Sequence, residues 1–216
     1  MGIKTRKTGD HRSTISFLRK HYAKRLEKFL VGQGNTDAKV IREEYEKRFT
    51  DYMNESDFGK NDGRFTSYLN IYSGLAAYEI LRERGFSQQQ GVEAYDFMCL
   101  TMRKLARSIH MLLDLFPNAY ERIVKSLLDD MDGDKAVCWD YETVENSDNR
   151  FEYKVTRCLY YDTCKAHGCP EFTAVFCNHD HYAFDGLHRH VRFERIGAIG
   201  DGYHCCHDIF HHIKKQ

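Results

Sequence analysis

Apolar residues recur every three or four positions along the first 131 residues, which is the spacing of amphipathic helices. The first such stretch runs from about Thr14 to Leu30, with Lys and Arg side chains between its apolar positions. Ser87 and Gln90 have the spacing of a capping box, which marks the start of a long helix. The pattern therefore predicts further helices over Asp37–Met53, Thr66–Arg84, Gln88–Phe116 and Asn118–Met131.

After residue 135 the period changes from helical to alternating, which is typical of strands with one buried face. One alternating stretch starts at Val137 and the next at Phe151, so we expect a hairpin. A second hairpin is predicted over Val191–Ile199 and His204–Ile213, around a turn at residues 200–202. Between the hairpins, Pro170 favours a short helix over Glu171–Cys177.

Helices followed by antiparallel strands indicate an α+β fold. We expect a helical region over residues 1–131, packed on a C-terminal antiparallel sheet of about four strands in a Cys- and His-rich region over 132–216. The two regions are expected to form one compact unit. Cys99 and Cys138 are assigned to core packing, and Met98, Met102 and Met111 to the inward face of the fourth helix.

Charge and hydropathy exclude several classes of protein. Lys plus Arg and Asp plus Glu number 32 each, so no global field attracts a nucleic acid. No run of 18 apolar residues is present, which argues against a membrane protein, and the N-terminal residues lack the apolar core of a secretory signal. We therefore expect a cytoplasmic protein with reduced thiols and a small-molecule partner.

The chemistry is concentrated near the C-terminus, where seven of eight cysteines and nine of twelve histidines follow residue 135. An ordered series there resembles the L-2-amino-thiazoline-4-carboxylic acid hydrolase family: Cys158, Phe176-Cys177-x-x-Asp180, Arg195, Gly202 and Cys206. The resemblance covers roughly the C-terminal third. In one departure from the family pattern, His207 separates Cys206 from Asp208, which leaves the role of Asp208 open.

The resemblance implies hydrolysis of a cyclic isothiourea, in which water or a thiolate adds to the carbon between sulfur and nitrogen. It implies Cys177 as nucleophile, Asp180 as base or orienting group, and Cys206 as a second reactive thiol. Arg195 would hold the substrate carboxylate, with His181 as a further substrate-binding residue. A protonated imidazole at His179 or His181 would stabilise a thiolate at Cys177. The alternative to these catalytic roles is a structural one, in which Cys177 is a buried apolar residue and Arg195 is a structural ion-pair partner.

Two other interpretations stay open at this point. The protein could act without a cofactor, or it could bind zinc through its His- and Cys-rich stretches. The candidate zinc ligands are His179, His181, Cys206 and His207. The same residues would equally serve a non-catalytic sensor module that binds a small molecule or a metal. A third possibility is a helical protein that binds a partner through its basic first helix.

Overall fold

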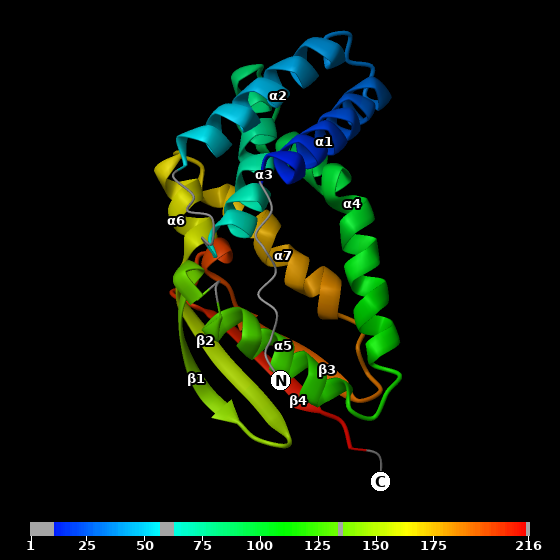
Figure 1. The fold of residues 1–216 in the computed structure, drawn as a ribbon, viewed down its shortest axis with the longest axis vertical. Coiled ribbons are helices and arrows are strands. Elements are labelled where there is room, and N and C mark those ends of the chain that lie inside the picture. The colour runs from blue at the N-terminus through cyan, green and yellow to red at the C-terminus, as the bar shows by residue number, and fades with distance from the viewer. Residues whose placement is uncertain (1–10, 57–62, 134–135, 215–216) are drawn as a thin grey trace. The chain divides into compact units, whose positions relative to one another are not determined.

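The computed structural model describes residues 11–56, 63–133 and 136–214 (Figure 1). The chain divides into two compact units, Met1–Met98 and Cys99–Gln216, and this boundary lies inside the long helix α4 (Gln88–Leu113). The predicted division into residues 1–131 and 132–216 stays a prediction. Helices and a four-stranded antiparallel sheet are both present, with most helices before the strands, as the periodicity predicts.

The first unit contains α1 (Arg12–Gly32), α2 (Ala38–Glu55), α3 (Phe65–Glu83) and the first part of α4. These helices begin and end within about three residues of the predicted bounds. The capping box is confirmed, because the Ser87 N–H donates to Gln90 Oε1 at 2.8 Å and the Gln90 N–H donates to Ser87 Oγ at 3.2 Å. Side chains that are fully buried between the helices form the core of this unit: Leu26, Leu30, Ile41, Tyr45, Phe49, Ile71 and Leu75.

Part of the basic face of α1 is used inside this unit. Arg19 donates to Thr50 Oγ1 at 3.1 Å, and Arg25 Nε donates to the Phe97 carbonyl at 2.9 Å. These arginines therefore fix α1 to neighbouring helices.

The second unit contains the rest of α4, α5 (Ala119–Asp132) and the sheet. Its strands are β1 (Trp139–Asn146), β2 (Arg150–Cys158), β3 (Val191–Gly197) and β4 (Cys206–His212), in the order β1-β2-β4-β3 with every pairing antiparallel. Both predicted hairpins are confirmed. The turn in the second hairpin ends at Gly202, whose φ of 90° lies in the left-handed region that glycine adopts readily.

One face of the sheet is covered by helices. Register places Phe151 opposite Phe210 and Phe210 opposite Phe193, and these rings pack with Phe184 and with apolar residues of α5. Figure 1 shows α5 lying across the strands. The alternate residues face the other way, where Glu152 pairs with His207 at 2.6 Å. The covered face therefore holds every second residue of β2 and β4.

The segment between the hairpins differs from the prediction of one short helix over Glu171–Cys177. It contains α6 (Leu159–Ala166), a 3₁₀ turn at Pro170–Phe172, and α7 (Thr173–Phe184). Polar residues at 178–181 interrupt the apolar period of α7, so its second half gives no helical signal. Burial of Phe176 and Phe184 shows that tertiary packing holds this helix in place.

Most of the assigned core residues are confirmed. Cys99, Cys138 and Met98 are buried, and Met111 packs against the core of the second unit. The inward placement of Met102 is wrong, because this residue is 50% exposed. Within the described residues, no helix is long and apolar enough to span a membrane.

Candidate active site

Arg195 of β3 is the centre of a buried ionic group on the covered face of the sheet. Its Nε and Nη2 donate to the two carboxylate oxygens of Asp208 at 2.5 and 2.7 Å. Asp208 lies directly opposite on β4, and both side chains are only 4% exposed. The pairing is bidentate and shielded from water, which makes it strong and geometrically fixed.

Helix α7 supplies the remaining partners of this arginine. Arg195 Nη1 donates to the Cys177 carbonyl at 2.9 Å, and Nη2 donates to Asp180 Oδ2 at 2.8 Å. Cys177 and Asp180 are three residues apart, so they share one face of the helix. Each guanidinium nitrogen of Arg195 thus has a protein partner, and Arg195 fixes α7 to the sheet.

The ionic group holds one cation and two carboxylates. Tyr153 of β2 adds a neutral donor, because its hydroxyl donates to Asp208 Oδ2 at 3.1 Å. Burial raises the pKa of Tyr153 well above its ordinary value, and the nearby carboxylates add to this rise. Tyr153 therefore stays protonated, and the group of Arg195, Asp180 and Asp208 has a formal charge of −1 when both carboxyl groups are ionised.

Asp180 is the carboxylate of this group that solvent reaches. Half of its side-chain surface is exposed, whereas Asp208 is buried. Close packing by protein atoms raises the pKa of Asp180 even though the Arg195 charge opposes that rise. Asp180 thus presents a carboxylate at a partly open position.

Two thiols meet beside this group. Cys206 lies two residues before Asp208 on the same sheet face, and it accepts a hydrogen bond from the Ile199 N–H at 3.3 Å. A further hydrogen bond joins Cys206 to the Cys177 thiol; it lowers the pKa of Cys206 and, together with burial, raises that of Cys177. Of the two thiols, Cys206 therefore has the lower pKa.

Close packing at Gly200 holds this thiol pair in place. A Cβ at position 200 would lie 2.8 Å from Cys177 Sγ and 2.9 Å from the Ala174 backbone nitrogen. Both distances are too short for a real side chain, so this close approach requires glycine. The turn that carries the Ile199 N–H can thus pack directly on α7.

His179 does not support a thiolate as expected. Burial, with the charge of Arg103, lowers the pKa of His179 to about 3, so this imidazole is neutral near pH 7. His181 lies on the face of α7 that carries Cys177, where it contacts Asp185 at 3.2 Å and the Phe193 ring. Hydrogen bonds from Cys177 and from the Ile199 N–H, together with the charge of Arg195, lower the pKa of Cys206.

The candidate metal ligands are not gathered in one place. Two residues apart on α7, His179 and His181 point about 200° apart. His207 follows Cys206 in β4, so it faces the opposite side of the sheet, where it pairs with Glu152. Residues 11–56, 63–133 and 136–214 contain no cluster of three or more His, Cys, Asp or Glu side chains that could hold a metal ion. The zinc interpretation therefore lacks support.

The structure brings together four of the predicted site residues, namely Cys177, Asp180, Arg195 and Cys206. Sequence reasoning missed Tyr153 and left the role of Asp208 open. The signal for both was strand alternation, since Asp208 shares the face of Cys206, and Tyr153 lies opposite Asp208 on β2.

Comparison with known protein families shows to which family the chain is related. The model of the L-2-amino-thiazoline-4-carboxylic acid hydrolase family matches residues 64–210, more than half of the chain. The chain belongs to this hydrolase family. No curated protein and no solved structure matches it significantly.

The family match extends further than the resemblance seen in the C-terminal third, because it includes α3, α4 and α5 as well as the sheet. All the site residues of this hydrolase-family member lie within the matched range. The departure at His207 leaves the site intact, because the strand turns His207 away and keeps Asp208 on Arg195.

Proposed function

We propose that the chain opens a small cyclic isothiourea or amidine-like acid, with the Cys206 thiolate as nucleophile and the Asp180 carboxylate as the anchor for the substrate's protonated nitrogens. One observation carries this proposal: a thiol of lowered pKa adjoins an ionic group that has one carboxylate in excess. The family name supports a hydrolase of this class.

The excess carboxylate suits a cationic substrate. An amidine-like carbon becomes electrophilic when its nitrogens are protonated, and two parallel N–H groups match one carboxylate. Asp180 is half exposed, whereas Asp208 is held by Arg195 and Tyr153. Asp180 is therefore the carboxylate that binds the cation and keeps it protonated.

The chemistry then follows in two steps. The Cys206 thiolate adds to the carbon between ring sulfur and nitrogen, and the ring C–S bond breaks with its electron pair on the substrate sulfur, which takes up a proton. Water adds to the same carbon, two protons leave, and the bond to Cys206 breaks with its electron pair on Cys206. The product is a carbamoyl derivative with a free thiol.

In this scheme Arg195 has a positioning role in place of the predicted contact with the substrate carboxylate. Its nitrogens already bind Asp208, Asp180 and the carbonyl of Cys177. Loss of Arg195 would leave Asp208 as a buried carboxylate without its counter-charge.

The test is turnover of 2-aminothiazoline-4-carboxylate, followed by the release of free thiol and by the mass of the product. We expect Cys206→Ser and Asp180→Asn to lose about 100-fold or more in kcat/KM, because one removes the nucleophile and the other the counter-charge. Cys205→Ser is the matched control, since Cys205 is the neighbouring buried thiol and contacts His204.

Full activity in Cys206→Ser would overturn the assigned nucleophile. Saturable binding of the compound without any turnover by the wild-type protein would overturn the hydrolase proposal and favour the non-catalytic binding module.

A further inference from the structure

The C-terminal half of α4 belongs to the second unit, and its polar side packs against other elements of that unit. Arg107 Nη1 donates to the Tyr182 carbonyl at 2.9 Å, and the His110 ring lies 4.6 Å from the Phe184 ring. Asp114, just after the helix, accepts hydrogen bonds from the backbone of residues 188–191. These positions are three or four residues apart, so they form one face, which packs along α7 and the segment that follows it.

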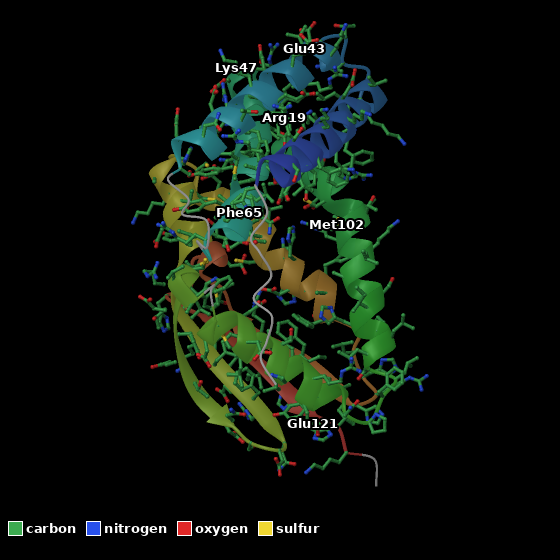
Figure 2. All side chains as sticks on the ribbon, in the orientation of Figure 1. Arg19, Glu43, Lys47, Phe65, Met102 and Glu121 are labelled. Atoms are coloured by element: carbon green, nitrogen blue, oxygen red, sulfur yellow. The ribbon has the colours of Figure 1, made fainter. Side chains whose placement is uncertain are left out.

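The opposite side of this half-helix is apolar and exposed. We call it the α4 seam, and its residues lie at alternating spacings of three and four. It consists of Met102, Leu105, Ile109 and Leu112 on the helix and of Phe116, which follows the end of the helix at the next spacing of four. Each is between 50% and 61% exposed, and Figure 2 marks Met102 on α4. At 100° per residue, the seam points roughly away from the polar face. This polarity is the reverse of an ordinary surface helix, whose apolar side faces its own core.

The seam continues a repeat that starts near the beginning of the helix. The same alternation of four and three runs backward through Met98, Tyr95 and Gly91, which are buried in the first unit. There Tyr95 donates to the Asn70 carbonyl at 3.2 Å, and a Cβ at Gly91 would lie 2.6 Å from the Tyr78 ring. One side of α4 thus has the heptad spacing of a helix pair, covered in its first half and exposed in its second.

We propose that the α4 seam is a self-association surface, on which the same seam of a second copy of the chain packs. With Leu115, which is also 50% exposed, six large apolar residues between positions 102 and 116 are each about half exposed. Each presents on the order of 100 Å² to water, so the patch reaches the upper range seen on monomers. Two copies would bury about 1,200 Å², which is the lower limit for a stable interface.

The residues beside the seam favour a second copy over a different partner. Thr101, Ala106 and Ser108 flank it and carry no charge. Two identical helices can therefore approach without repulsion between like charges, and no charged edge is present to select an unlike partner. A two-fold axis near Ile109, the middle residue of the seam, brings the two Ile109 side chains together.

The test is the mass of the full-length protein in solution, measured by light scattering and sedimentation over a wide range of concentration. We expect a dimer in the wild type, and a shift to single chains in Ile109→Glu and Ile109→Lys, with a loss of affinity of about 100-fold or more. Mixing these two variants should restore the dimer, because the opposite charges then meet.

The matched control is Val144→Glu, which places the same charge at an equally exposed apolar residue on β1. Its mass should equal that of the wild type. A wild-type protein that is a single chain at every concentration, variants that stay dimeric, or a mixture that stays dissociated would each overturn the proposal.

Discussion

Cys177, which is half-buried, and Cys206, which is buried, differ in what donates to each sulfur. Each sulfur accepts a backbone N–H, from Ile199 at Cys206 and from Gly200 at Cys177, but Cys206 also accepts from the Cys177 thiol. Hydrogen bonds to a sulfur stabilise its charged form, so the pKa values of the two thiols move in opposite directions. The lower pKa of Cys206 is therefore due mainly to the hydrogen bond from the Cys177 thiol.

This asymmetry predicts how the thiols react with pH. The rate of alkylation of Cys206 should rise through a midpoint below the ordinary thiol pKa, because its thiolate is stabilised. Cys177→Ala removes the main donor, so the midpoint of Cys206 should move upward. Peptide mapping after pulses of iodoacetamide at different pH values measures both midpoints.

Cys205→Ala serves as the control and should leave the Cys206 midpoint where it is. A Cys206 midpoint at or above the ordinary value, or one that Cys177→Ala does not move, would contradict the assignment.

At the scale of elements, Asp114 fixes the segment that leads into β3, residues 188–191. The Asp114 carboxylate, which follows α4, accepts hydrogen bonds from the N–H groups of His188, Arg189, His190 and Val191 at 2.9 to 3.0 Å. These bonds lower the pKa of Asp114, although burial opposes them. The start of β3, and with it the position of Arg195, thus depends on Asp114.

We expect Asp114→Ala to lower the free energy of unfolding by about 2 to 4 kcal/mol, because four N–H groups lose a charged acceptor. Asp129→Ala is the control, since Asp129 is exposed and forms a surface pair with Lys125. Urea denaturation at neutral pH measures both changes, and equal stability of the two variants would contradict this role.

The contribution of Asp114 to the free energy of unfolding depends on pH. The pKa of Asp114 is lower in the folded than in the unfolded protein, so its stabilising effect is present above the unfolded value of about 3.9. That effect is lost as the pH falls through the lower, folded pKa. The difference in stability between wild type and Asp114→Ala should therefore shrink below about pH 4.

At the scale of the whole molecule, the family match leaves out α1 and α2, although both helices belong to the core of the first unit. Leu26 of α1 is fully buried, whereas Phe17 of the same helix is 68% exposed. Helices α1 and α2 are thus integral parts of that unit.

We expect Leu26→Ala to cost about 2 to 5 kcal/mol of stability and Phe17→Ala less than about 0.5 kcal/mol, because only the first leaves a cavity. Far-UV circular dichroism during urea denaturation follows the helices. Fluorescence of Trp139, the single tryptophan, follows the second unit separately. An unchanged dichroism transition in Leu26→Ala would show that α1 is not part of a cooperative core.

The sequence by itself determined the elements whose signals are local. Helical periods, the Ser87–Gln90 capping box and the alternation of β1 and β2 depend on neighbours a few residues away, and the structure confirms them. The α+β class follows from the order of these elements. The family resemblance likewise depended on residue types at short spacings, such as Cys177 and Asp180.

Tertiary structure decided what depends on partners far apart in the chain. The partners of Arg195 lie 13 to 18 residues away in the chain, and Tyr153 lies 55 residues from Asp208. Strand register and the packing of α7 therefore determine which of these side chains come into contact. Periodicity also shows that α4 has an apolar side but not which side faces its own unit. Arg107, His110 and Asp114 decided that through their long-range contacts, which turned Met102 and its neighbours toward solvent.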